Sequence, residues 1–295
     1  MPKLFRNILY PTDFSKASEA IASHVMGVAK VFEANVRLLS VVPPFSDFHG
    51  VSETYFTSLG DTANINMEQY QQAAELEAKQ KLERLQQLHF DPATSAICVG
   101  TGGVAESIVD YAKDIKADLI MMSTRGLGVM RRFLIGPVTA KVLHDATCPV
   151  WTSPHPRELE PFHPYRHIVL AIDYRGWPPS LLAHAAEISA LFDAQLSGVS
   201  ASPDGGLAGD EAVQKHSREI AARLHDDIAK LNIEARVHVM EGEPGEVVRH
   251  FAEQIEDADL IVTGRGRLDE SMGHLRTHSY EIIWNAPCPV MTLRG

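Results

Sequence analysis

Short runs of apolar residues alternate along the whole chain with longer stretches that have helical periodicity. The runs are continuously apolar, which is typical of strands buried on both faces of a parallel sheet. In the first half, the expected strands are Ile8–Tyr10, Val36–Val42, Ala96–Val99, Leu119–Met122 and Val150–Thr152. In the second half, they are Ile168–Ile172, Leu196–Ser200, Ala235–Met240, Leu260–Thr263 and Val290–Leu293.

Helices are expected between these strands. Ser15 is a candidate N-cap for a helix whose apolar positions keep helical spacing as far as Phe32. Further helices are expected from Asn66 to Leu88, from Val104 to Ile115 and from Val138 to Leu143. Strands that alternate with helices predict a doubly wound α/β domain.

The second half of the sequence repeats the first. The stretch Ile8-Leu9-Tyr10-Pro11-Thr12-Asp13 is matched by Ile168–Asp173, Ala117-Asp118-Leu119-Ile120 by Ala258–Ile261, and Cys148-Pro149-Val150 by Cys288–Val290. Two copies are too few for a solenoid, so each copy is expected to be a domain with its own core. We assign residues 1–153 to the first domain, 154–164 to a proline-containing linker and 165–295 to the second domain.

Composition narrows the class of protein. The chain has 295 residues and a formal net charge of −11, and neither half carries a basic run. This argues against nonspecific binding to nucleic acid or to an anionic membrane. The absence of an apolar signal segment and of disulfide-like spacing among Cys98, Cys148 and Cys288 leads us to expect a cytoplasmic protein.

Two segments are candidates for a ligand site, because ligands of open parallel sheets bind at the carboxyl ends of the strands. Asp13 follows the first strand, although an aspartate there also fits a simple helix cap or Asx turn. After the fourth strand comes Ser123-Thr124-Arg125-Gly126. Nine residues separate Gly126 from Gly136-Pro137-Val138-Thr139, which opens a helix. Glycines and a helix N-terminus favour phosphate, but two glycines at this spacing also fit an ordinary turn.

Together these motifs resemble the universal stress protein family, and the resemblance covers both halves. It implies two tandem domains, each a five-stranded parallel sheet with helices on both faces, paired through their last strands as an internal pseudo-dimer. The nucleotide-binding branch of the family implies ATP, alone or with Mg, held by a G-x-x-G-x9-G-S/T loop. The resemblance assigns the nucleotide site to Pro11, Thr12, Asp13, Val41, Ser123, Arg125, Gly126, Gly136, Pro137, Val138 and Thr139.

This chain departs from that pattern at several positions. Ser123 replaces the first glycine, and Pro137 replaces the serine or threonine, which removes an N–H and a hydroxyl from the phosphate side. Thr139 is the remaining candidate for a hydroxyl in that helix. The second half departs further, and we expect its site to be degenerate. Its candidate residues are Asp173, Gly264, Gly266, Arg276 and Thr277.

Three functions remain open from the sequence. The first is a stress-response or signalling protein that binds an adenine nucleotide as a regulatory switch and has an unknown protein partner. The second is a slow ATPase or a self-phosphorylating protein, and the third is an adaptor with relic sites. We expect no catalytic residue and no metal site, because no P-loop lysine or general base is recognisable, and the pair His274 and His278 has no completing ligand. The resemblance leaves a further homodimer open. The irregular segment from Phe45 to Ile65 is expected to be a mobile loop near the site.

Overall fold

A computed structural model describes most of the chain, and every structural statement below concerns those residues. They are residues 4–44, 67–124, 135–153, 160–173, 176–202, 210–231, 234–255, 257–265 and 278–294. The segment from Phe45 to Ile65, expected to be a mobile loop, lies outside them.

The first half has the strand and helix order that the hydrophobic pattern predicts. Its elements are β1 (Asn7–Pro11), α1 (Lys16–Ala20), α2 (Ala22–Phe32), β2 (Asn35–Val42), α4 (Met67–His89), β3 (Ser95–Thr101), α5 (Val104–Asp114), β4 (Leu119–Ser123), α6 (Pro137–Asp145) and β5 (Val150–Ser153). All neighbouring strands within this half are parallel, in the order β3-β2-β1-β4-β5. The doubly wound fold is therefore confirmed.

The second half repeats the same order. Its elements are β6 (His167–Asp173), α7 (Pro179–Phe192), β7 (Gln195–Ser202), α8 (Asp210–Ala229), β8 (Ala235–Glu241), α9 (Pro244–His250), η3 (Phe251–Ile255), β9 (Leu260–Gly264), α10 (His278–Asn285) and β10 (Val290–Leu293). The π-helical turn η3 has no counterpart in the first half, where α5 is a single α-helix. The segment from Gly242 to Ala258 is one residue longer than the matching segment from Gly102 to Ala117, and a π-turn accommodates the extra residue.

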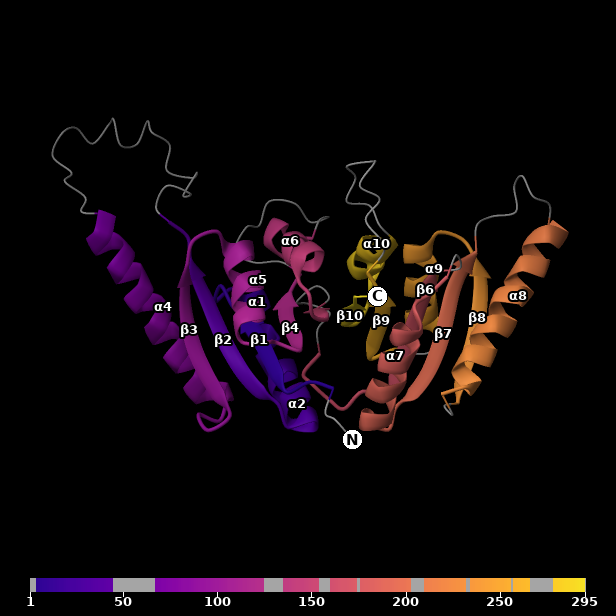
Figure 1. Ribbon diagram of the computed structural model, residues 1–295, viewed down its shortest axis with the longest axis horizontal. Coiled ribbons are helices and arrows are strands. Elements are labelled where there is room, and N and C mark those ends of the chain that lie inside the picture. The colour runs from indigo at the N-terminus through magenta and orange to yellow at the C-terminus, as the bar shows by residue number, and fades with distance from the viewer. Residues whose placement is uncertain are drawn as a thin grey trace, which may run out of the picture.

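The two halves join through their last strands, as the resemblance implied. β5 and β10 pair antiparallel, with Met291 opposite Trp151, and this makes one ten-stranded sheet. The hydroxyls of Thr152 and Thr292 donate to the backbone oxygens of Val290 and Val150, each at 3.2 Å. Figure 1 shows the resulting arrangement, with α6 and α10 near the centre and α4 and α8 at the two ends.

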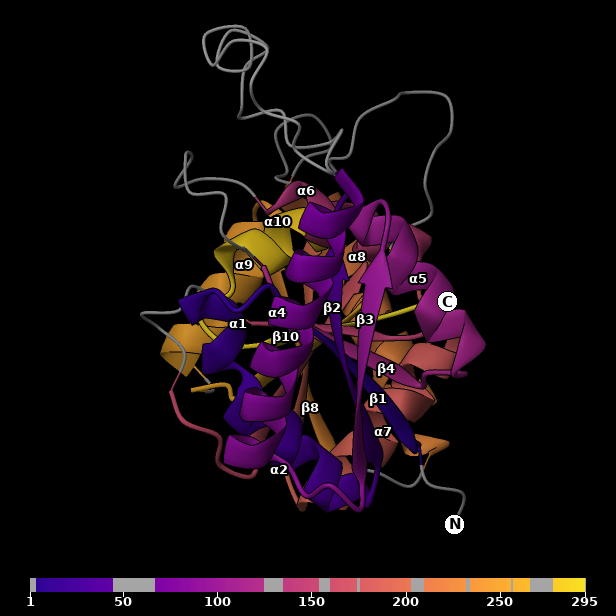
Figure 2. The same ribbon diagram turned by 90° about the vertical axis from the view of Figure 1, so that its left-hand side faces the viewer.

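Two apolar layers hold the helices against the sheet. One layer lies under α2 and α4 in the first half and continues under α7 and α8 in the second. The other lies under α5 and α6 and continues under α9 and α10. Figure 2 shows α4 and α5 on opposite sides of β3. Because each layer runs through both halves, the domains share their cores across the β5–β10 junction.

The helix expected from Ser15 to Phe32 is interrupted. Ile21 separates α1 from α2, and its backbone stays right-handed at φ −81° and ψ −7°, so the apolar face continues across the interruption. Part of the expected linker packs onto α2. A Cβ added to Gly27 would lie 2.0 Å from Cδ1 of Phe162, so this ring approaches the helix at a position without a side chain.

Candidate functional site

The candidate site of the first half lies at a topological switch point. β1 lies between β2 and β4, and the chain leaves β1 towards one face of the sheet and β4 towards the other. Ligands of doubly wound sheets bind where the connections diverge in this way, at the carboxyl ends of the strands. Asp13 follows β1, and Ser123 ends β4, so the fold brings the two sequence candidates to neighbouring strand ends.

The turn after β1 is held by side-chain hydrogen bonds. The Ser15 N–H donates to Oδ1 of Asp13 at 3.0 Å, which is the Asx turn that the alternative interpretation of Asp13 predicted. The Phe14 N–H donates to Oγ1 of buried Thr12 at 3.1 Å and supports a left-handed φ of 58° at Phe14. Left-handed backbone at a bulky residue is strained and persists where the surroundings enforce it. The turn is therefore rigidly set, with the half-buried Asp13 at its start.

Strand register shows a difference between the two halves beside this turn. In the first half, Val41 at the end of β2 lies beside Gly100 of β3. In the second half, the paired positions of β7 and β8 are Ala201 and Met240. A Cβ at Gly100 would lie 3.5 Å from both Val41 Cγ2 and Leu39 Cδ1, which is ordinary van der Waals contact, so the first half differs from the second in having no side chain at this position beside Val41. The Met240 side chain instead packs against the apolar layer at that place in the second half.

The opposite wall of the site is the start of α6. Gly136 is its N-cap and forms no side-chain cap, and Pro137 occupies the first turn. The Gly136 N–H donates to the carbonyl of buried Thr124 at 2.9 Å, which joins the two ends of the loop between them. A helix N-terminus without a side-chain cap offers backbone N–H groups and a favourable dipole to an anion. Val138 and Thr139 follow Pro137 in that turn.

The hydroxyl of Thr139 joins α6 to β4. The Thr139 side chain is 3% exposed, and its hydroxyl donates to the Ser123 carbonyl at 3.0 Å. Ser279 of α10 makes the same bond to the Gly264 carbonyl at 2.7 Å. The repeated bond anchors each helix to the strand before it.

The remaining sequence candidates are distributed as follows. Pro11 is the buried last residue of β1. Asp173 is the exposed last residue of β6, and Gly264 ends β9. Arg125, Gly126, Gly266, Arg276 and Thr277 lie outside the described residues.

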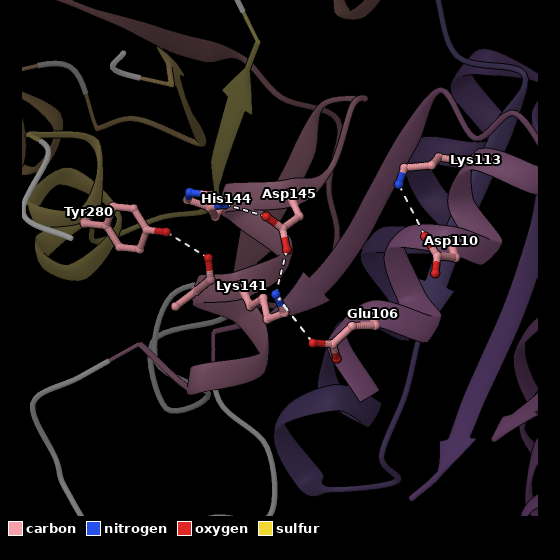
Figure 3. Close-up of polar contacts among 8 residues, drawn as sticks. Glu106, Asp110, Lys113, Lys141, His144, Asp145 and Tyr280 are labelled. Carbon is pink, nitrogen blue, oxygen red and sulfur yellow. Dashed lines mark hydrogen bonds and ion pairs between the residues drawn. The ribbon is translucent and has the colours of Figure 1, made fainter. Parts of the chain in front are cut away.

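A surface network of charges adjoins α6. The Lys141 ammonium lies 2.9 Å from Oδ2 of Asp145 and 3.4 Å from Oε1 of Glu106 on α5 (Figure 3). The hydrogen bonds from His144 and Lys141 hold the pKa of the Asp145 carboxyl below its usual range. These partly exposed pairs join α5 to α6 at the surface, and such pairs contribute little to stability.

Other candidate chemistry concerns thiols, metals and membranes. Burial raises the pKa of the Cys148 thiol to about 11, and it raises that of Cys288 as well, so both are core thiols. In the parts of the chain that are described, no group of three or more His, Cys, Asp or Glu side chains is placed to hold a metal ion. Within the same parts, no helix combines the length and apolar character needed to cross a membrane.

Two features of the site were missed from the sequence. One is the contrast between Gly100 and Met240, for which a signal exists: both stand two residues before the glycine of the next turn, Gly102 or Gly242. The other is Arg265, whose guanidinium donates to the carbonyls of Ala146 and Cys148 in the first half. It directly follows the last residue of β9, so its spatial counterpart after β4 is Thr124.

The fold and site define a tandem, doubly wound α/β protein with one candidate site at the switch point of each half. A profile of the Universal stress protein family matches residues 4–154 and 164–294, and the chain therefore belongs to this family.

The chain is similar to several named proteins and solved structures. Universal stress protein MJ0531 of Methanocaldococcus jannaschii is 32% identical over 155 residues, which is 52% of this chain and 85% of that protein. A crystal structure of a universal stress protein from Archaeoglobus fulgidus shares the fold over 100% of this chain and 99% of its own, with a TM-score of 0.66 and 21% identity. Another universal stress protein of that organism, solved in complex with dAMP, is 25% identical and covers 44% of this chain and 99% of its own, with a TM-score of 0.36.

Proposed function

We propose that the first domain binds ATP or a related adenine nucleotide, alone or with Mg, and that the protein acts as a cytoplasmic stress-response switch. The observation that carries the proposal is that three features lie at the carboxyl ends of the adjoining strands β3, β2, β1 and β4. They are the rigid turn at Asp13, the position without a side chain at Gly100 beside Val41, and the N-terminus of α6. We expect the base beside Val41 and the phosphate at the helix N-terminus.

The same observations support one nucleotide per chain. In the second domain, Met240 fills the place that Gly100 leaves open, and the site-side residue of β7 is the smaller Ala201. Glu241 and Glu243 add negative charge beside the turn after β8, where the first domain has Thr101 and Gly103. Negative charge there disfavours a phosphate.

The first prediction tests this assignment with Gly100→Met. The added Cβ meets only ordinary contacts at 3.5 Å, so the variant should fold, while the longer side chain should fill the space beside Val41. Calorimetry with ATP should give a stoichiometry near one for the unaltered protein and an affinity lower by about tenfold or more for the variant. Gly100→Ala is the matched control and should bind within about twofold of the unaltered protein.

Two outcomes would count against the proposal. Absence of heat with ATP, AMP and cyclic AMP, with and without Mg, would remove nucleotide binding and favour the adaptor function. Equal ATP affinity in Gly100→Met and Gly100→Ala would place the base elsewhere.

A regulatory role is favoured over a catalytic one by the chemistry of the site. Pro137 offers no N–H and no hydroxyl where the family pattern has a serine or threonine, and the hydroxyl of Thr139 is directed at Ser123. The sequence contains no P-loop lysine and no recognisable general-base motif for phosphoryl transfer. We expect ATP turnover below about one per minute, against an enzyme median of roughly ten per second. Faster turnover, or phosphate transferred to the protein, would favour the alternative of a slow ATPase or self-phosphorylating protein.

A further inference from the structure

Two side chains of the second domain cross the domain boundary and contact α6 of the first. The Tyr280 hydroxyl on α10 donates to the Ala140 carbonyl of α6 at 2.8 Å (Figure 3). The guanidinium of Arg265 donates to the Ala146 carbonyl at 2.5 Å and also to the Cys148 carbonyl. The first contact lies one residue beyond Thr139, and the second lies in the turn that follows α6.

The Arg265 contact is electrostatic as well as geometric. Burial lowers the pKa of its guanidinium to about 10, so the group keeps its charge at neutral pH. A cation at the end of a helix complements the negative end of the helix dipole, just as an anion complements the start. Ala146 is the C-cap of α6, so Arg265 lies at the end of the helix opposite to the candidate phosphate position.

Both residues also lie beside the segment that connects β9 to α10 in the second domain. Arg265 follows β9 directly, and Tyr280 lies in the first turn of α10. The base of that loop is closed by the Ser279 hydroxyl on the Gly264 carbonyl, next to both contacts. The residues on either side of this segment are therefore both fastened to the first domain. Tyr280 is bonded to Ala140 within α6, and Arg265 is bonded to Ala146 and Cys148, which follow the last residue of α6.

We infer that Arg265 and Tyr280 are positioning residues for the first-domain nucleotide site and act through α6. The inference rests on the proposed function, and it gives the degenerate second domain a role: its loop ends hold the helix whose N-terminus receives the phosphate. Binding at a helix N-terminus requires its N–H groups to be held in place, so freeing α6 should weaken binding without altering any group at the site itself.

The test uses the full chain and the variants Arg265→Gln and Tyr280→Phe, with Arg223→Gln as control. Arg223 is an exposed residue of α8 whose guanidinium lies 4.7 Å from the centre of the Trp177 ring, so the control removes a cation from the second domain without altering a contact to α6. Each test variant should bind ATP about fivefold more weakly, whereas Arg223→Gln should bind as the unaltered protein does. Amide hydrogen exchange of Val138 to Lys141 in the absence of nucleotide should be faster in the two test variants only.

The outcomes separate this inference from the proposed function. If the unaltered protein does not bind nucleotide, the proposed function fails, and the exchange of α6 alone decides whether Arg265 and Tyr280 hold the helix. Unchanged exchange in both test variants would overturn the inference. An equal loss of ATP affinity in Arg223→Gln would also overturn it, since the effect would then reflect general destabilisation.

Discussion

The imidazole of His24 lies between two aromatic rings and fastens the chain segment that leads into the second domain. It is 5% exposed, and its Nε2 lies 2.8 Å from the Glu160 carbonyl. Its ring centroid is 5.4 Å from that of Trp151 and 5.6 Å from that of Phe162. Burial lowers the pKa of His24, and the nearby His163 lowers it further, so the folded protein favours the neutral ring.

The second prediction concerns the pH dependence that follows from this residue. The unfolded chain binds a proton at His24 near the ordinary pKa of 6.5, whereas the folded protein does so only at lower pH. The unfolded state therefore binds more protons between the two pKa values, so the His24 contribution to stability falls as the pH decreases below 6.5. Urea unfolding at about pH 7.5 and at about pH 5.5 should show a smaller stability difference for His24→Phe than for the unaltered protein. An equal difference in the two proteins would show that His24 does not contribute.

At this scale the sequence predicted the strand ends at which candidate residues lie but not the direction of their side chains. Asp13 follows β1, and Val41 is near the end of β2, as expected. The direction of the Thr139 hydroxyl depends on how close α6 comes to Ser123, and no local sequence pattern determines that distance. The contrast between Gly100 and Met240 depends on the register of two strands that are far apart in the chain.

Among the elements, α2 shows how a missing side chain sets a packing distance. Gly27 lies inside α2, where glycine costs about 1 kcal/mol relative to alanine. The Phe162 ring occupies the place that a Cβ would take. Gly27 is thus explained by the close packing of Phe162, which belongs to the linker between the domains, and not by a turn.

The third prediction is that Gly27→Ala destabilises the protein despite its better helix propensity. The Cβ would lie 2.0 Å from the ring, and the resulting strain should cost about 1–3 kcal/mol of the free energy of unfolding. In the background of Phe162→Ala the same substitution should be neutral or stabilising, and urea unfolding of the four proteins measures this coupling. Additive effects in the four proteins would refute direct packing.

The hydrophobic pattern predicted where the strands lie but not the irregularities within the helices. The hydrophobic pattern places all ten strands, because buried parallel strands read as continuous apolar runs. It does not show the interruption at Ile21, where the apolar spacing continues unbroken, or the π-turn after α9, which appears only when the two repeats are aligned.

The whole molecule is built around the antiparallel pair of β5 and β10. Trp151 is fully buried at the centre of this pair, and its Nε1 donates to the Tyr165 hydroxyl at 3.1 Å. Both apolar layers continue across the pair. Shared layers couple the folding of the two halves.

The fourth prediction is that the protein unfolds in a single transition and that Trp151→Ala separates it into two. Removing the indole should cost about 3–5 kcal/mol and should remove one of the contacts that join the halves, the hydrogen bond to Tyr165. Urea unfolding followed by far-ultraviolet and near-ultraviolet circular dichroism should give coincident curves for the unaltered protein only. Trp177→Phe is the control, because Trp177 follows β6 and its ring contacts Arg223 of α8, away from the β5–β10 pair. It should lower stability while keeping one transition. Two transitions in the unaltered protein would contradict the coupling.

The covalent link between the halves has a consequence for how this protein could diverge after duplication. Two identical subunits must carry the same residue at both sites, so any change that closes one site also closes the other. A tandem chain is released from that constraint, and its halves are held together at a fixed effective concentration that dilution does not change. The tandem chain can therefore carry Gly100 in one half and Met240 at the matching place in the other, and can use Arg265 of one half to hold a helix of the other.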